Sequence, residues 1–299
     1  MPEWQGKSQG NTTGFRIFIF LIKTFGVRSA YFLLYFVAGY FFTFSYKSSR
    51  HILNYYKRLG FKGLKSYTML YRNYYVFGQT LIDKIAVMAN TSTKFTIDFD
   101  GEENLREMVK VGKGGLLLSG HAGNWEAAGH LLKRLNTKIN IVMYDGEDEQ
   151  IKNYLDSVTG EKNFNVIYVK NDLSHIYKIS EALSANQIVC MHADRFRPGN
   201  KTLQCKFLGE KARFPEGPFL LTLKLKVPVA YVYSFKESAT HYHFFSTEIK
   251  YFYQSQGSTM QSILEDFAQS LEGMLKRYPE QWFNYYDFWE PEQLKKSTI

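Results

Sequence analysis

The chain has 299 residues, of which 45% are hydrophobic and 22% are charged. This is the composition of an ordinary globular protein, and it excludes an intrinsically disordered chain. The two cysteines, Cys190 and Cys205, are too few for a disulfide framework, and no paired Cys or His spacing indicates a zinc site. We therefore expect two reduced thiols in a cytoplasm-like compartment.

The net charge of +9 belongs to the first quarter of the chain. Residues 4–82 contain eleven Lys and Arg and no Asp or Glu, whereas the other residues nearly balance, with 26 basic and 28 acidic side chains. Basic residues beside apolar sequence attract an anionic membrane surface, each by about 1 kcal/mol. We predict a membrane partner and no nucleic acid, because the segment is too apolar for a solvated basic arm and carries no nucleic-acid-binding motif.

The first predicted element is a hydrophobic, membrane-associated helix. Residues 14–46 contain thirteen aromatic side chains, and residues 29–46 carry no charge over eighteen positions. A helix needs about 20 apolar residues to span a bilayer, and Tyr and Phe prefer its interface. We predict that residues 1–90 form a membrane-anchoring helical region, and whether its helix spans the bilayer stays open. The alternative is a buried core helix of a soluble protein.

From about residue 93, strand and helix patterns alternate along the chain. In chain order we predict strand 95–99, helix 102–111, strand 115–119, a helix that Asn124 can cap, strand 139–143, helix 147–155, strand 165–169, helix 173–183, strand 187–192, helix 218–225, strands 227–235 and 242–249, and helix 260–275, which ends before Pro279. This alternation predicts an α/β domain at residues 91–299, with a mostly parallel central sheet flanked by helices. In such folds the active residues gather at the carboxyl ends of strands.

The segment at residues 118–129, LSGHAGNWEAAG, carries the strongest catalytic pattern. His121 follows a predicted buried strand, glycines at 120 and 123 permit a sharp turn, and Glu126 comes five residues after the histidine. We predict His121 as a general base, a role worth about 10²–10⁴-fold, and Glu126 as the carboxylate that fixes its tautomer. The alternative is a purely structural histidine. Ser119 is no hydrolase nucleophile, because Leu117 replaces the glycine expected two residues before it.

The segment at residues 189–200, VCMHADRFRPGN, ends a predicted strand with charged residues. We predict Asp194 as a positioning group and Arg195 and Arg197 as a clamp for phosphate or phosphopantetheine, which suits the donor fork of arginine. A surface turn with a solvated ion pair is the alternative. His192 is predicted to be a core residue of the strand.

A third segment, residues 207–221, contains Pro and Gly residues that open a predicted helix. Helix starts bind anions, so we predict that Arg213 and Gly217 contact substrate, and we place Asn124 in the same substrate-binding set. A structural loop is the alternative.

These segments, in this order behind a hydrophobic amino terminus, resemble the lipid A lauroyl/myristoyl (late) acyltransferase family of the lysophospholipid acyltransferase-like superfamily. His121 and Glu126 match its His followed after four residues by an acidic residue, and Asp194 matches its Asp at a later strand end. Residues 207–209 and 215–218 match its Phe–Gly stretch and its Pro-x-Gly-Pro helix start, and residues 278–282 (YPEQW) match its carboxyl-terminal pattern.

The resemblance implies a glycerolipid-acyltransferase-like fold and an enzyme without cofactor or metal. The implied reaction moves a fatty acyl chain from acyl-carrier protein, or from acyl-CoA, to a hydroxyl of a membrane lipid acceptor, with a lipid A precursor as the expected one. The implied location is the inner (cytoplasmic) membrane, with the catalytic domain on the cytoplasmic side.

Two departures from the family pattern concern the acceptor. Family members often carry an Arg where Tyr144–Asp145 stands here, and their usual Asp–Gln pair is Asp194–Arg195 in this chain. A different amphiphilic acceptor, such as an aminolipid or a pigment, is therefore an alternative. A non-catalytic membrane-binding protein on the same scaffold and a lipid hydrolase are two others.

Overall fold

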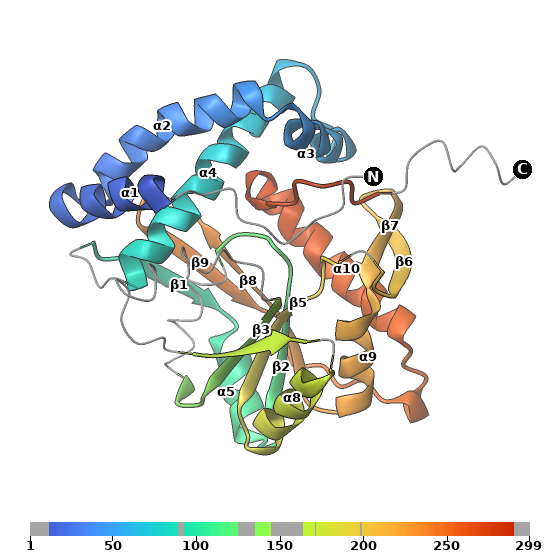
Figure 1. The fold of residues 1–299 in the computed structure, drawn as a ribbon. Coiled ribbons are helices and arrows are strands. Elements are labelled where there is room, and N and C mark those ends of the chain that lie inside the picture. Colours follow the sequence, from blue (N-terminus) through green and yellow to red (C-terminus); the bar gives the residue numbers. More distant parts are fainter. Residues whose placement is uncertain are drawn as a thin grey trace, which may run out of the picture.

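The computed structural model describes residues 12–88, 93–124, 135–144, 164–170, 172–197 and 199–289. The chain begins with four helices that lie together beside the sheet (Figure 1). They are α1 (Thr12–Phe25), α2 (Val27–Phe44), α3 (Tyr46–Arg58) and α4 (Leu64–Met88). Among the described residues, α2 is the one helix that is long and apolar enough to cross a membrane, which confirms the predicted amino-terminal apolar helix.

The remaining described residues form an α/β structure. Its strands are β1 (Thr96–Asp100), β2 (Gly115–Ser119), β3 (Ile139–Tyr144), β4 (Asn165–Val169), β5 (Ile188–His192), β6 (Thr202–Phe207), β7 (Glu210–Pro215), β8 (Val229–Lys236) and β9 (His241–Ser246). Its helices are α5 (Glu102–Lys110), α8 (Ser174–Ser184), α9 (Glu216–Leu225) and α10 (Met260–Arg277), with short 3₁₀ turns η2 (Gln254–Gln256) and η3 (Pro279–Gln281).

Seven strands form one sheet in the order β1-β9-β8-β2-β5-β3-β4. The β8–β9 pair is antiparallel, and every other pair of neighbours in this sheet is parallel. All five residues of β2 are buried, as expected for an apolar strand at the centre of a parallel sheet. The predicted fold class, α/β with a mostly parallel sheet, is confirmed.

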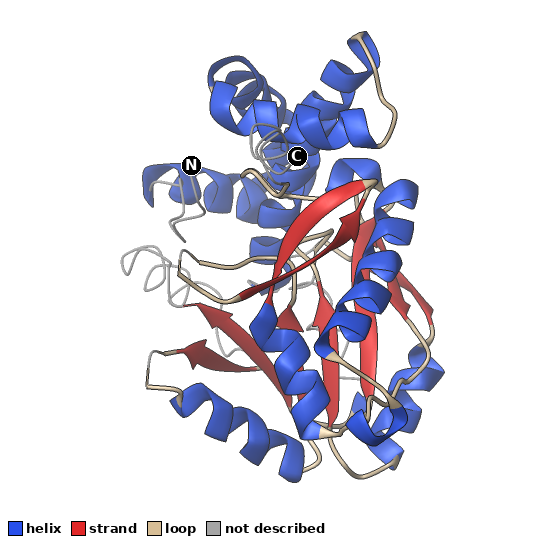
Figure 2. Cartoon of the chain, turned by 90° about the vertical axis from the view of Figure 1, so that its right-hand side faces the viewer, coloured by secondary structure: helices blue, strands red, loops and turns tan. Residues whose placement is uncertain are grey.

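Helices cover both faces of this sheet (Figure 2). Leu117 of β2 packs with Leu105 and Met108 of α5, whereas Leu116 and Leu118 belong to the cluster that contains the apolar face of α10. The alternation along β2 therefore sends successive leucines to opposite faces, where each fully buried side chain contributes about 2 kcal/mol.

The predicted elements agree with the structure except in one region. β6 and β7 form an antiparallel hairpin, a small sheet of its own, where the sequence analysis predicted no strand. Predicted helix 147–155 and the helix after Asn124 lie outside the described residues.

The amino-terminal helices share their core with the α/β structure. Ala38 of α2, Tyr56 of α3 and Leu70 of α4 belong to the same buried cluster as Leu118 of β2 and Phe267 of α10. The side chain of Asn73 in α4 also donates to the carbonyls of Glu280 and Trp282, both at 3.0 Å. The division into regions 1–90 and 91–299 stays a prediction, and these contacts hold the two regions together.

Candidate active site

Two neighbouring strands carry the predicted His and Asp just beyond their last residues. β2 and β5 are parallel, and Ser119 at the end of β2 lies opposite His192 at the end of β5. His121 and Asp194 each come two residues after this pair. Because neighbouring parallel strands end at the same edge of a sheet, the register itself brings the two side chains together.

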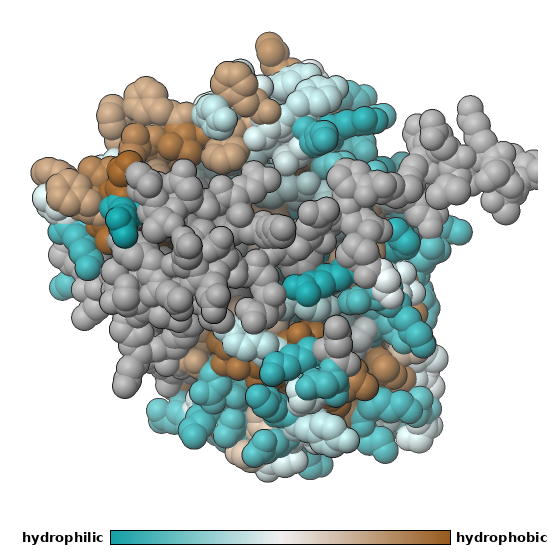
Figure 3. Space-filling model, in the orientation of Figure 1, coloured by the Kyte–Doolittle hydropathy of each residue, from teal (hydrophilic) through white to brown (hydrophobic). Residues whose placement is uncertain are grey.

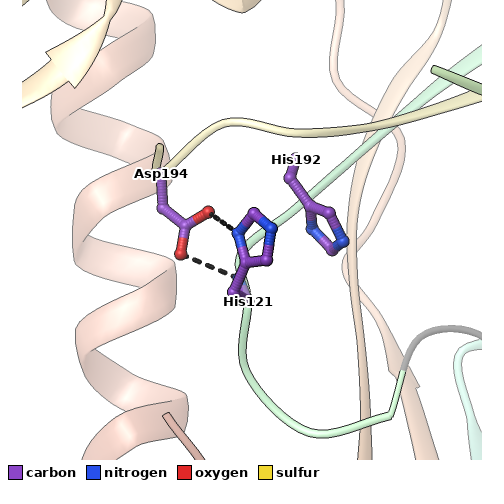
Figure 4. A group of neighbouring side chains, drawn as sticks. All are labelled: His121, His192 and Asp194. Carbon is purple, nitrogen blue, oxygen red and sulfur yellow. Dashed lines mark hydrogen bonds and ion pairs between the residues drawn. The ribbon is translucent and has the colours of Figure 1, made fainter. Parts of the chain in front are cut away.

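The imidazole of His121 and the carboxylate of Asp194 form a hydrogen-bonded pair (Figure 4). His121 Nδ1 lies 2.6 Å from Asp194 Oδ1, and the backbone N–H of His121 donates to Asp194 Oδ2 at 2.8 Å. The indole N–H of Trp282 donates to the same Oδ2 at 3.4 Å, and Asp194 is completely buried. A carboxylate with this many donors stays ionised, so Nδ1 carries the ring proton and Nε2 keeps its lone pair.

The electrostatics of the site favour a neutral imidazole beside an ionised carboxylate. Burial lowers the pKa of His121 below its usual 6.5, the Arg195 guanidinium lowers it further, and Asp194 opposes both. Burial alone would raise the pKa of Asp194, but His121 and then Arg195 hold it well below its usual range. A neutral His121 can accept a proton, and the buried carboxylate stabilises the imidazolium that results.

A His–Asp pair at the ends of two parallel strands can act as a general base. Comparison with known proteins identifies the family of the chain. The family model for the bacterial lipid A biosynthesis acyltransferase matches residues 14–290. The chain belongs to this family. A search of curated proteins gives no match. The resemblance drawn from the sequence motifs is confirmed, and membership of the lipid A acyltransferase family implies an acyltransferase activity for the protein.

In this acyltransferase the carboxylate that contacts the histidine is Asp194. Glu126, predicted to orient His121, lies outside the described residues, so its role stays a prediction. The single hydrogen of Nδ1 already points to Asp194, and a second carboxylate cannot orient the ring through the same hydrogen. If Glu126 reaches the site, it therefore meets Nε2 or the substrate.

His192 is a residue of the site that the sequence analysis missed, because it assigned this histidine to the strand core. Its ring lies against that of His121 in a tilted arrangement, with 4.1 Å between the centroids and 31° between the planes. Burial lowers the pKa of His192 well below 6.5, so it is neutral. The missed signal was the period of two in a strand, which places His192 and Asp194 on the same side.

The cluster of His121, His192 and Asp194 brings potential metal-binding atoms within 4.8 Å of one another. Asp194 already accepts from His121 Nδ1, so this nitrogen and this carboxylate oxygen are engaged with each other. We therefore interpret this cluster as a proton-transfer site.

The loop after His121 is fixed by backbone contacts that require glycine. Gly123 has a φ of 70°, and a Cβ there would lie 1.9 Å from the carbonyl oxygen of Ser234. The N–H of Asn124 donates to that same carbonyl at 2.7 Å. The Asn124 side chain is buried and donates to Thr80 O at 3.3 Å and Tyr242 Oη at 3.1 Å. These contacts give Asn124 a part in positioning the loop, and its predicted contact with substrate stays a prediction.

Of the predicted arginines, Arg195 lies at the His–Asp pair, whereas Arg197 and Arg213 each lie over an aromatic ring. Arg195 lies beside Asp194, and its guanidinium donates to the carbonyl of Phe283. Arg197 lies 4.2 Å from the ring centre of Tyr144, and Arg213 of β7 lies 5.4 Å from that of Phe196. Gly217 lies in the first turn of α9, after Pro215. The structure thus brings Arg195 to the His–Asp pair, while substrate contact by all four residues stays a prediction.

The lowered pKa of His121 predicts the pH dependence of activity. The neutral imidazole is the active form, and a lowered pKa keeps it neutral to a lower pH. We expect kcat/KM to stay level at neutral pH and to fall on acidification with an apparent pKa below 6.5. Arg195→Gln, which removes a positive neighbour, should move this fall to higher pH. The measurement is kcat/KM against pH for both proteins, and a fall at the same pH in both would contradict the assignment.

Proposed function

We propose that this protein transfers a fatty acyl chain from an acyl thioester, acyl-carrier protein or acyl-CoA, to a hydroxyl of a membrane lipid, with a lipid A precursor as acceptor. The observation that carries the proposal is the His121–Asp194 pair, with 2.6 Å between Nδ1 and Oδ1 at adjacent strand ends. Family membership supports acyl transfer as the reaction class.

The proposed reaction gives each atom of the pair a role. His121 Nε2 accepts the proton of the acceptor hydroxyl as its oxygen attacks the thioester carbonyl carbon. The new C–O bond forms, the C–S bond breaks, and the imidazolium returns the proton to the departing thiolate. Asp194 accepts from Nδ1 throughout and stabilises the imidazolium, as a buried carboxylate does beside a catalytic histidine.

The proposed location is the cytoplasmic face of the inner membrane. Acyl-carrier protein and acyl-CoA are cytoplasmic donors, whereas the acceptor cannot leave the bilayer, so the enzyme has to work where the two meet. The basic residues at 4–82 and the apolar helix α2 support attachment to an anionic membrane.

The experiment that tests the function is acyl transfer by the purified protein in detergent. A lipid A precursor is incubated with acyl-carrier protein or coenzyme A thioesters, and the lipids are analysed by mass spectrometry with His121→Ala as the blank. A mass gain of one acyl chain that depends on His121 supports the proposal. Acylation of another amphiphile instead would show that the acceptor is wrong, and free fatty acid alone would show a hydrolase.

Arg213 provides a test of the substrate-binding assignment. We expect Arg213→Ala to raise KM more than it lowers kcat, because lost binding of an anionic group weakens the ground state and the transition state equally. Lys211→Ala is the matched control, since Lys211 is an exposed cation two residues earlier on the same face of β7. Steady-state kinetics of both variants decide the matter. Equal losses in kcat and kcat/KM would place Arg213 at the reacting centre instead.

A further inference from the structure

Helix α2 has two faces of different character. Its inner face is buried and consists of Val27, Ala30, Tyr31, Leu34 and Ala38. Its outer face carries aromatic side chains four residues apart, each at least 60% exposed: Phe32, Phe36, Tyr40 and Phe44. Phe20 and Phe25 of α1 are exposed to the same degree, and Figure 3 shows a hydrophobic area over α1 and α2. An apolar surface of this extent on a soluble body marks a contact with a partner or a membrane.

The inner face is held by a buried charged network. Asp83 of α4 is completely buried and accepts from Tyr31 of α2, from Lys236 of β8 and from Tyr242 of β9. Lys236 Nζ also donates to Tyr31 Oη at 3.0 Å. If α2 left the protein to cross a bilayer, Tyr31 would leave this network. The buried Asp83–Lys236 ion pair would then lose one of its hydrogen-bond partners, which is costly for buried charges.

Close packing holds the same face. Gly78 of α4 lies so near α2 that a Cβ there would come within 2.3 Å of Leu34 Cδ1. A glycine at such a contact allows the two helices to approach closely. In addition, the ring of Tyr35 in α2 stacks on the ring of Tyr75 in α4, with 4.4 Å between the centroids. The helix therefore belongs to the body of the protein along its inner face.

Charge at the two ends of the helix indicates what meets the outer face. Lys23 and Arg28 are exposed before the aromatic row, and Lys47 and Arg50 are exposed after it. Residues 4–82 contain no carboxylate that would oppose an anionic surface. Phe and Tyr flanked by cations suit the boundary between lipid headgroups and acyl chains, where an in-plane helix lies.

We propose that α2 lies along the surface of an anionic lipid bilayer, with the row Phe32, Phe36, Tyr40 and Phe44 inserted shallowly, and that it does not cross the bilayer. This inference rests on the proposed function only in that a lipid acceptor requires membrane contact. Helix α4 packs against α2 and also contacts the loop after His121, because the side chain of Asn124 donates to the carbonyl of Thr80. Docking of α2 therefore sets the orientation in which the active site meets the membrane.

The test is a depth measurement on the full chain. Single cysteines replace Phe32, Phe36, Tyr40 or Phe44 in turn and carry an environment-sensitive fluorophore. The unsubstituted chain serves as the labelling blank, because Cys205 is buried and Cys190 half-buried. Vesicles of phosphatidylcholine and phosphatidylglycerol carry lipids spin-labelled at several depths. We expect shallow insertion at all four positions, with none near the bilayer centre. A gradient along the helix, with the middle positions near the bilayer centre, would overturn the proposal.

A second measurement identifies the partner of the face. The combined variant Phe32→Ser, Phe36→Ser and Phe44→Ser should lose binding to these vesicles by roughly tenfold or more for each Phe removed. Tyr177→Ser is the control, since Tyr177 is 79% exposed and belongs to α8, a helix that lies away from α2 (Figure 1). If the combined variant keeps vesicle binding and changes the oligomeric state in solution, the face meets a second copy and the proposal is wrong. Activity on detergent-dispersed substrate, measured in parallel, reports on the proposed function separately.

Discussion

We expect His121→Ala to abolish acyl transfer while the fold remains intact. The substitution removes the Nε2 atom that accepts the hydroxyl proton, a contribution of roughly 10²–10⁴-fold. Little packing is lost, because the side chain of His121 keeps 24% of its surface exposed. The buried Asp194 still accepts from the backbone N–H of residue 121 and from Trp282. The measurement is the turnover of purified protein by mass spectrometry, with circular dichroism and thermal unfolding to check the fold.

A second histidine provides the control for this substitution. The side chain of His241 on β9 is 25% exposed and lies beside Asp98 and Glu237, and in the sheet β8 separates β9 from β2 and β5, which carry the site. His241→Ala should therefore keep turnover near the wild-type rate, although it also removes an imidazole beside carboxylates. Wild-type turnover by His121→Ala on a demonstrated substrate would mean that the mechanism is wrong.

Local patterns were sufficient to predict most elements of the sheet, but not their order. The apolar run of β2 and the alternation of strands with helices were visible in the sequence, and both follow from burial. The antiparallel β8–β9 pair and the place of β1 beside β9 depend on contacts between distant residues. The β6–β7 hairpin was not predicted although Leu203, Cys205 and Phe207 alternate with polar residues, which is typical of a strand.

The residues of the site could also be predicted from local patterns, but their pairing could not. His121 was found because glycines surround it between a strand and a predicted helix, and Asp194 because it ends an apolar strand. Their pairing was not predicted, because it depends on the register that sets Ser119 opposite His192. The nearest carboxylate that follows His121 in the chain is Glu126, and this proximity in sequence favoured Glu126 as its partner.

The amino-terminal helix was predicted from its composition, whereas its orientation needed the structure. Aromatic residues occur on both faces of α2, so hydropathy does not distinguish the face that packs on the protein from the face that is exposed. The inner face is distinguished from the outer one by Ala30, Ala38 and the hydroxyl of Tyr31. Their roles become visible only in the structure, where α4 packs against α2 and Asp83 accepts from Tyr31.

The carboxylate that orients His121 can be identified by comparing Asp194→Asn with Glu126→Gln. We expect Asp194→Asn to lower kcat by roughly 10²–10⁴-fold and to have the larger effect of the two. Asp194 Oδ2 accepts from the His121 backbone N–H, so an asparagine oxygen there can keep this bond and turn its amide N–H toward Nδ1. Nδ1 then becomes the acceptor, the ring proton moves to Nε2, and the base has the wrong tautomer.

The same comparison separates orientation of the ring from direct contact with substrate. Glu126→Gln leaves the 2.6 Å contact between His121 and Asp194 unchanged, so it should lower the rate less and leave the pH of the acidic fall in place. Among the described residues, Asp194 is the neighbour that raises the pKa of His121, so the residual activity of Asp194→Asn should persist to lower pH. Both variants need kcat and kcat/KM across pH, together with a thermal unfolding check. A larger loss in Glu126→Gln, with the acidic fall displaced, would make Glu126 the orienting carboxylate and Asp194 a structural one.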